Sequence, residues 1–382
     1  MRARAAIGIA ALTIVAAGCA VVGDVRPFDS DEATTQLEVD EARIWYDCAR
    51  WDKQIANSGA IYADAELESY LQGVVDRLYP EFQDAMHIHP FRGFVPNAFV
   101  LPNGSIYFDV GLLARIDNEA QLAAIIGHEG AHFVERHTLT FHRVAKLHGN
   151  VAMIFGAATG IPLVGDVLAY SSMMGYSRDQ EREADLLGYW RMEAAGYDVR
   201  EAAGPFERLA KEAAALDYDI PVFFSSHPRM SERVESFRAL SASAPTDGRR
   251  DEDVYLARVE RATGDTLSTY LERRQPETVI FLLEDEGLLQ RLPERYRFYL
   301  AAAYRLRDHP GDAERAETEY HATLRACPDF APTYRALGML RMRDGHASAA
   351  CEHFSRYLEL APEAPDRAYV ESYLSRLREE MP

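Results

Sequence analysis

The chain has 382 residues, of which 48% are hydrophobic and 26% charged, so it is long enough for two folded domains of ordinary globular composition. Its formal net charge of −19 argues against a nucleic-acid partner, because phosphate binding requires clustered lysine and arginine and no such block is present. An acidic surface favours solubility and does not by itself indicate a substrate.

The first 18 residues have the features of a secretory signal peptide. Arg2 and Arg4 supply positive charge, Ile7 to Val15 form an apolar stretch, and the small residues 16–18 stand directly before Cys19. This arrangement resembles a bacterial lipoprotein signal, in which Cys19 becomes the lipidated N-terminus of the mature protein. The alternative is an ordinary secretory peptide that is cleaved nearby.

The residue after this cysteine is Ala20, as in lipoproteins that are sorted to the outer membrane. By this resemblance the protein is lipid-anchored on the periplasmic face of the outer membrane, or, without the lipid, soluble in the periplasm. Residues 19–35 are predicted to form a tether, since the sequence beyond Asp24 is polar and aperiodic. Val151 to Gly165 is the longest other apolar stretch, and it is too short for a bilayer, which requires about 20 residues.

Three cysteines remain when Cys19 is set aside, namely Cys48, Cys327 and Cys351. In a compartment that permits disulfides, at most one internal bridge can form among them. Cys327 and Cys351 are the pair predicted to share a domain.

Helical spacing of apolar residues predicts two helices, over residues 38–56 and 65–79. The next segments, 91–101 and 105–109, are rich in β-branched and aromatic side chains. They are separated by Pro102-Asn103-Gly104, a turn sequence, so a β-hairpin is expected.

A helical pattern resumes at Gly111 to Ile116 and again from Glu119, where Asp117 or Asn118 is placed to cap the helix. These elements predict a domain over residues 36–245 that is mainly α-helical, of the α+β class, with one short hairpin.

The helix after Glu119 carries the sequence His128-Glu129-Gly130-Ala131-His132. Residues four apart in a helix differ by about 40° around its axis, so His128 and His132 point to one place and can bind one metal ion. Glu129 is near enough to accept a proton from a water molecule on that metal. Gly130 is unexpected, since glycine inside a helix costs about 1 kcal/mol relative to alanine. The alternative is a helix with two surface histidines.

A catalytic zinc ion has three protein ligands and one open position, so a third ligand is needed. Ser177 to Asp185 is predicted to form a second helix, on which Glu181 and Asp185 share one face. Glu181 can bind the metal, while Asp185 accepts the outer N–H of a ligand histidine. Glu183 points about 160° away from that face. The alternative is a solvated charged helix.

A break in composition over Ser241 to Asp253 indicates a domain boundary, with a second domain over residues 246–382. In this domain similar residues recur at a spacing of 34, the period of tetratricopeptide repeats. The recurring pairs are Gly311 and Gly345, Ala316 and Ala350, Tyr320 and Phe354, Leu324 and Leu358, and Pro328 and Pro362. This periodicity predicts a C-terminal array of α-helix pairs.

Taken together, these motifs resemble those of a known family. The matching segments are Asn97-Ala98-Phe99, Pro102-Asn103-Gly104, Gly111-Leu112-Leu113, the His128 to His132 motif with His137 after it, Glu181 to Asp185 with Gly188, and His227-Pro228. They are similar to the gluzincin metallopeptidases of the HtpX and CAAX prenyl protease type, and most of all to the BepA-like periplasmic branch with tetratricopeptide repeats. The resemblance extends from about Asp40 to Leu240.

The resemblance implies a zinc metalloendopeptidase in which one zinc ion is held by the two histidines of the motif and by Glu181. It implies that Asn97 lies on an edge strand with which a substrate strand pairs. It also implies that His227 is either a fourth metal ligand or a donor to the oxyanion of the reaction. The alternative for His227 is an ordinary turn histidine before a proline.

The implied substrates are misfolded or unassembled outer-membrane proteins, and the implied role is quality control in the bacterial envelope. The repeats then hold unfolded or partly assembled clients, or dock on envelope assembly machinery. Two other classes stay open. One is a chaperone-like or scaffold lipoprotein with a latched or silent metal site, and the other is a non-haem iron oxygenase, which also uses two histidines and a carboxylate.

Overall fold

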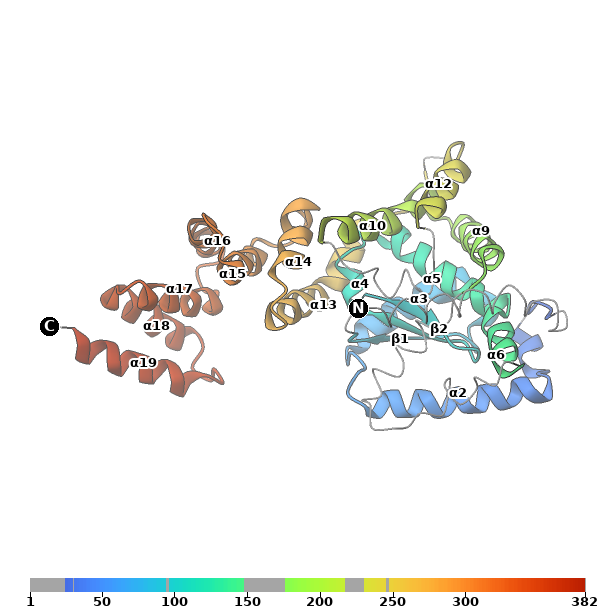
Figure 1. Ribbon diagram of the computed structural model, residues 1–382, viewed down its shortest axis with the longest axis horizontal. Helices are drawn as coiled ribbons and strands as arrows, with labels where there is room; N and C mark the ends of the chain where they lie inside the picture. Colours follow the sequence, from blue (N-terminus) through green and yellow to red (C-terminus); the bar gives the residue numbers. More distant parts are fainter. Residues whose placement is uncertain are drawn as a thin grey trace, which may run out of the picture. The chain divides into compact units, whose positions relative to one another are not determined.

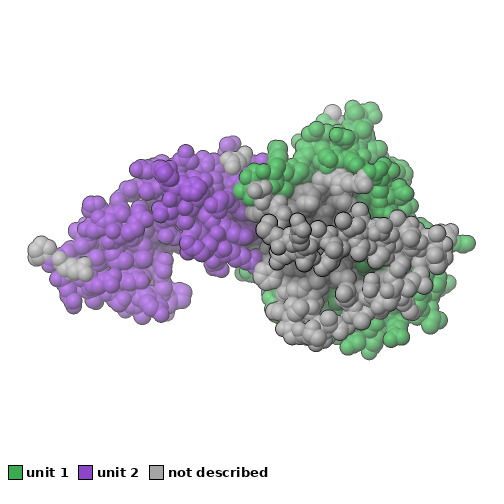
Figure 2. All heavy atoms as spheres, viewed as in Figure 1, with its two compact units in different colours: residues 1–263 green, residues 264–382 purple. Residues whose placement is uncertain are grey.

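The computed structural model describes residues 25–29, 31–93, 96–147, 176–216, 230–244 and 247–381. The chain forms two compact units, Met1–Thr263 and Gly264–Pro382 (Figure 2). The predicted signal peptide with Cys19, residues 20–24 and 30 of the predicted tether, and His227 lie outside the described residues.

The first unit begins with a 3₁₀ helix, Asp31–Thr35, and two α-helices, α2 (Val39–Asn57) and α3 (Ala65–Leu78), both close to their predicted positions. The side chain of Asp64 accepts a hydrogen bond from the amide of Leu67 and so caps α3. The apolar face of α3 is buried, namely Leu67, Leu71, Val74, Val75 and Leu78. A short 3₁₀ helix, Pro80–Phe82, follows.

Three strands form one small sheet in the order β1-β3-β2, with β1 at His87–Phe91, β2 at Ala98–Val100 and β3 at Ser105–Asp109. β2 and β3 are antiparallel and form the predicted hairpin, whose turn includes Gly104 with a φ of 87°. β1 pairs with β3 in parallel and was not predicted as a separate strand. A parallel pair has no local turn that would mark it in the sequence.

The helix with the two histidines, α5 (Glu119–Val134), is buried along its whole length. Asn118 caps it by accepting a hydrogen bond from the amide of Gln121 at 3.0 Å. α5 packs against α3, α9 and β2, and Figure 1 shows it inside the first unit. Its neighbours along the chain are α4 (Val110–Leu113) and α6 (His137–Leu147).

The predicted ligand helix is α9 (Arg178–Ala194), and its N-terminus has a capping box formed by Ser177 and Gln180. The remaining elements of the first unit are a 3₁₀ helix at Val199–Ala203, α10 (Gly204–Leu216), α12 (Met230–Ser241) and the first part of α13 (Glu252–Glu272).

The division between the two units falls inside α13, later than the break in composition suggests. Tyr255, Val259 and Ala262 of this helix belong to the hydrophobic core of the first unit. The hydroxyl of Tyr255 also donates a hydrogen bond to the carbonyl oxygen of Leu113 at 2.6 Å. The start of α13 is therefore part of the first unit, because it completes that core.

The second unit is a helical array. Its elements are α14 (Pro276–Ile280), a π-helical turn at Phe281–Asp285, 3₁₀ helices at Leu288–Gln290 and Glu294–Tyr296, α15 (Arg297–Arg307), α16 (Asp312–Ala326), α17 (Ala331–Arg343), α18 (Ala347–Leu360) and α19 (Arg367–Glu380).

Residues 34 apart occupy equivalent places in this array. Gly311 and Gly345 both have positive φ, at 86° and 77°, and each precedes the second helix of a pair. Tyr320 and Phe354 are both fully buried. The predicted fold class is confirmed: the described residues are mainly helical, with a small sheet and a C-terminal helical array.

Cys48, Cys327 and Cys351 are all free, so the structure contains no bond between the pair that was predicted to share a domain. Within the described residues, no helix combines the length and the apolar composition that crossing a bilayer requires.

Asp312 is expected to stabilise the second unit at neutral pH. Its carboxylate accepts hydrogen bonds from Nη2 and Nε of Arg307, at 2.7 and 2.9 Å, and from the amide of His309 at 2.9 Å. The hydrogen bonds from Arg307 lower the pKa of Asp312 from 3.8 to about 2. The stabilisation is therefore complete above the pKa of the unfolded chain and lost as the pH falls through the folded value.

We expect Asp312→Asn to lower the melting temperature at pH 7, as followed by circular dichroism. The difference from the wild type should shrink between about pH 4 and pH 2, where the wild-type carboxylate is also neutralised. A difference that stays constant over this range would show that the charge of Asp312 contributes nothing.

Candidate metal centre

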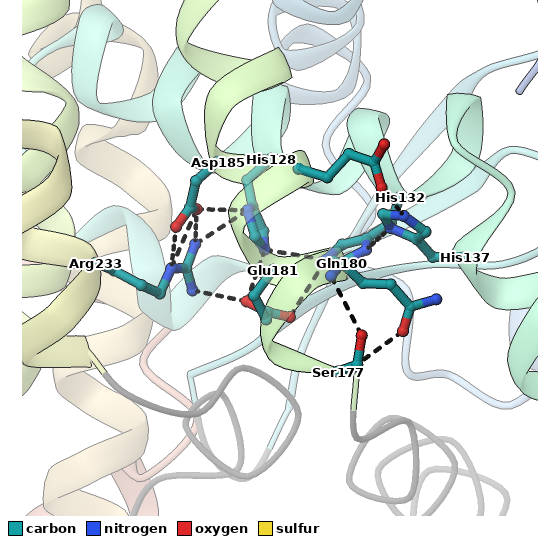
Figure 3. A network of polar contacts seen from close by, with 9 residues as sticks. His128, His132, His137, Ser177, Gln180, Glu181, Asp185 and Arg233 are labelled. Atoms are coloured by element: carbon teal, nitrogen blue, oxygen red, sulfur yellow. Dashed lines mark hydrogen bonds and ion pairs between the residues drawn. The ribbon is translucent and has the colours of Figure 1, made fainter. Parts of the chain in front are cut away.

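Three side chains from two helices converge inside the first unit: His128 and His132 from α5, and Glu181 from α9 (Figure 3). The Nε2 atoms of the two histidines are 3.1 Å apart. Oε2 of Glu181 lies 3.6 Å from Nε2 of His128, and its Oε1 lies 3.6 Å from Nε2 of His132. All three residues are buried.

These distances fit a single metal ion. Bonds of about 2.0–2.1 Å at tetrahedral angles place the ligand atoms of one ion roughly 3.3 Å apart. The observed separations of 3.1 to 3.6 Å bracket that value. Over the described ranges, no other group of three histidine, cysteine or acidic side chains comes together in this way. Two imidazoles and a carboxylate are a donor set suited to a transition metal or zinc.

Two glycines let α5 and α9 approach closely enough to form this group. A Cβ atom added to Gly188 would lie 2.9 Å from the carbonyl carbon of Gly127 and 2.9 Å from the amide nitrogen of His128. Helices pack at backbone contact only where side chains are absent. The crossing of the two helices at Gly127 and Gly188 therefore brings Glu181 within reach of the histidines.

Gly130, the unexpected residue in the motif, also has a steric explanation. A Cβ atom at this position would lie 2.2 Å from the ring of Tyr79 and 2.9 Å from the side chain of Met86. The Tyr79 hydroxyl donates a hydrogen bond of 2.5 Å to the carbonyl oxygen of Gly127. Tyr79 thus packs against α5 at the motif, and glycine at position 130 leaves room for the tyrosine ring.

The orientation of His128 is set by a carboxylate and an arginine. Its Nδ1 lies 2.9 Å from Oδ1 of Asp185, and Nη2 of Arg233 donates to the same oxygen at 2.6 Å. Nη1 of Arg233, a residue of α12, is also 3.5 Å from Oε2 of Glu181. The sequence predicted the place of Asp185, whereas the contact of Arg233 with both carboxylates depends on how α12 folds back on α9.

The protonation states at this position suit metal binding. Burial and the nearby Arg233 charge lower the pKa of His128 to about 4, so its imidazole is neutral. Burial disfavours the Asp185 anion, but Arg233 and His128 outweigh that effect and lower the pKa of Asp185. His128 consequently donates from Nδ1 to Asp185 and keeps the lone pair of Nε2 for a metal.

His132 has different neighbours. Its ring stacks on that of Tyr176, with centroids 3.7 Å apart and an angle of 13° between the planes. Its Nδ1 lies 2.9 Å from Nδ1 of His137, and Nε2 of His137 lies 3.2 Å from Oε2 of Glu183. Burial and the neighbouring His132 lower the pKa of His137. The sequence indicated His137 only as part of the family pattern.

Glu129 lies on α5 directly after His128 and is 1% exposed. A cavity of about 320 Å³ between α9 and α12 adjoins the site, with Glu181, Asp185 and Arg233 in its lining. The carboxylate side of the metal group therefore faces an open volume.

Asn97 is fully buried and precedes β2. Its carbonyl oxygen accepts a hydrogen bond from the amide of Asp109 at 2.9 Å, so its main chain is directed toward β3. In an antiparallel pair, alternate residues direct their backbone N–H and C=O groups away from the partner strand. In β2 these residues are Ala98 and Val100. β2 is an edge of the sheet within the described residues. Pairing of a substrate strand near Asn97 stays a prediction.

Comparison with known proteins agrees with this geometry. Residues 63–241 match the model of peptidase family M48. The chain is 32% identical to the mitochondrial metalloendopeptidase OMA1 of Schizosaccharomyces pombe over 151 residues, which are 38% of this chain and 44% of that protein. It is 25% identical to the beta-barrel assembly-enhancing protease of Escherichia coli over 272 residues, which are 65% of this chain and 54% of that protein.

The chain thus spans about half the length of these curated relatives. The family match includes both histidines of the motif, Glu181 and Asp185, and it confirms the resemblance found in the sequence. Over residues 63–241 the chain belongs to peptidase family M48.

Proposed function

We propose that this protein is a zinc-dependent metalloendopeptidase with one zinc ion per chain, held by His128, His132 and Glu181. The observation that carries the proposal is the convergence of their three ligand atoms, 3.1 to 3.6 Å apart, within a region that matches family M48. Three ligands of this type leave the fourth position of a zinc ion open for chemistry.

When bound, zinc supplies polarisation of the scissile carbonyl and lowers the pKa of a water molecule to about 7. Glu129 acts as the general base: it accepts the proton of the attacking water and passes it to the nitrogen of the leaving amine. The products are a new carboxylate and a new amine. Because Glu129 is 1% exposed, this proton transfer takes place away from bulk solvent.

Asp185 and Arg233 contribute by orientation. Oδ1 of Asp185 accepts the hydrogen bond from Nδ1 of His128, 2.9 Å away, and so directs Nε2 toward the other ligand atoms. Arg233 keeps Asp185 ionised, since its guanidinium donates to this carboxylate with both Nε and Nη2. A geometry held in this way does not need to be assembled each time a substrate binds.

The proposed substrates are misfolded or unassembled outer-membrane proteins, and the proposed location is the periplasmic face of the outer membrane, through a lipid on Cys19. The name of the Escherichia coli relative, which refers to β-barrel assembly, supports this role. We propose that the second unit consists of tetratricopeptide-like repeats. These repeats hold partly folded clients or dock on envelope assembly machinery. His227 serves as a fourth ligand or as an oxyanion donor.

Metal analysis of the purified full chain tests the proposal. We expect one zinc per chain, cleavage of casein and of an unfolded outer-membrane β-barrel protein, loss of cleavage with a chelator, and recovery when zinc is restored. The same β-barrel protein folded in detergent micelles is the matched control, and it should resist cleavage.

Two other outcomes would contradict the proposal and favour a different class of protein. Iron in place of zinc would favour the oxygenase class. Zinc without cleavage of either unfolded protein would favour a chaperone-like or scaffold lipoprotein with a silent site.

A further inference from the structure

The two ligand histidines are supported by different partners, which lie on two sides of the metal group in Figure 3. His128 contacts Asp185 and Arg233, whereas His132 contacts His137. We propose that His137 and Glu183 are positioning residues that set the tautomer and the orientation of His132. This inference rests on the proposed function, because it assumes that His132 binds a metal through Nε2.

The positions of the protons follow from the order of the contacts. Nε2 of His132 is the nitrogen that faces the other ligand atoms, at 3.1 Å from His128 and 3.6 Å from Glu181. A neutral imidazole that binds metal through Nε2 carries its proton on Nδ1. That Nδ1 lies 2.9 Å from Nδ1 of His137, which must then accept the hydrogen bond with its lone pair.

The next contact completes the series. Since Nδ1 of His137 accepts, the proton of this second imidazole is on Nε2, which lies 3.2 Å from Oε2 of Glu183. An ionised carboxylate only accepts hydrogen bonds, so the donor and the acceptor are assigned at each contact of this series. His137 is 4% exposed and the side chain of Glu183 is 56% exposed, so the hydrogen bonds lead from the buried ligand to the surface.

The backbone between the two histidines is shaped for this contact. In an uninterrupted helix His132 and His137 would differ by about 140° around the axis and would not meet. The chain instead turns at Arg136, which has a left-handed φ of 54°, and α6 begins at His137. Nε of Arg136 donates to Oε1 of Glu41 at 3.0 Å, and the two side chains also form an ion pair. Tertiary contacts therefore hold a backbone conformation that few residues other than glycine adopt.

The experiment compares zinc affinities, measured by competition with a chromophoric chelator at pH 7. His137→Phe keeps a ring and removes the acceptor, and we expect it to weaken zinc binding by about 10- to 100-fold. His137→Asn retains an acceptor oxygen near the position of Nδ1 and should recover part of this loss. Glu183→Ala, at a largely exposed position, should weaken binding by a few-fold. Asp179→Ala, which removes an exposed acid from the same helix, is the matched control and should leave the affinity unchanged.

Two results would overturn the inference: wild-type affinity in both His137→Phe and Glu183→Ala, or equal loss in His137→Phe and His137→Asn, which would indicate packing alone. The melting temperature of the metal-free variants reveals any failure to fold, and Glu183→Ala remains informative in that case. If the wild type binds no zinc, the proposed function itself fails. If the wild type binds zinc and the variants do so equally, only the inference fails.

Discussion

Replacement of Glu129 by glutamine is expected to lower the rate of peptide hydrolysis by a factor of about 10² to 10⁴, with the zinc content unchanged. Glutamine has nearly the same shape as glutamate, but its amide does not accept a proton at neutral pH. Because Glu129 is buried, a base from the solvent does not readily take its place. The measurement is kcat on a fluorogenic peptide or casein, with zinc determined in the same samples.

Glu193→Gln, at an exposed position near the end of α9, is the control and should cleave at the wild-type rate. Undiminished cleavage by Glu129→Gln would contradict the proposed proton transfer to Glu129. Loss of zinc from Glu129→Gln would show instead that this residue maintains the metal site rather than taking part in the reaction.

The second large effect is expected from Gly188→Ala. The added Cβ atom would lie 2.9 Å from backbone atoms of both Gly127 and His128, so α5 and α9 must move apart. Overpacking of this kind typically destabilises a protein by about 1–3 kcal/mol. Because α9 carries Glu181, the same movement separates the third ligand from the histidines. We expect a lower melting temperature together with a clear loss of zinc affinity.

Gly73→Ala is the matched control. Gly73 lies inside α3, and an added Cβ atom there has no neighbour within 4 Å. Alanine is the better helix former by about 1 kcal/mol, so this variant should be as stable as the wild type or more stable. If Gly188→Ala bound zinc as the wild type does, the close helix crossing would not be what places Glu181.

Much of the site was evident from local sequence. The helices α2 and α3 lie close to their predicted ranges, and α5 and α9 begin within one residue of their predicted starts. Apolar periodicity and capping residues such as Asn118 and Ser177 act within a few positions along the chain. The spacing of four between His128 and His132 placed both ligands on one helix face, and the same spacing placed Glu181 beside Asp185. The family resemblance joined these two helices into one site, and the match to the family model covers both of them.

Local sequence was therefore enough to predict helices α2 and α3, the starts of α5 and α9, the hairpin, the residue types of the metal group, and Asp185 as the partner of a ligand histidine. The further side chains that support the metal group became evident from the tertiary structure. Arg233 reaches Asp185 from α12, and His137 reaches His132 because the chain turns at Arg136. The parallel strand β1 and the division of the chain within α13 were settled in the same way. Each depends on contacts between residues that are distant in sequence or separated by a turn, and such contacts leave no periodic signal in the chain.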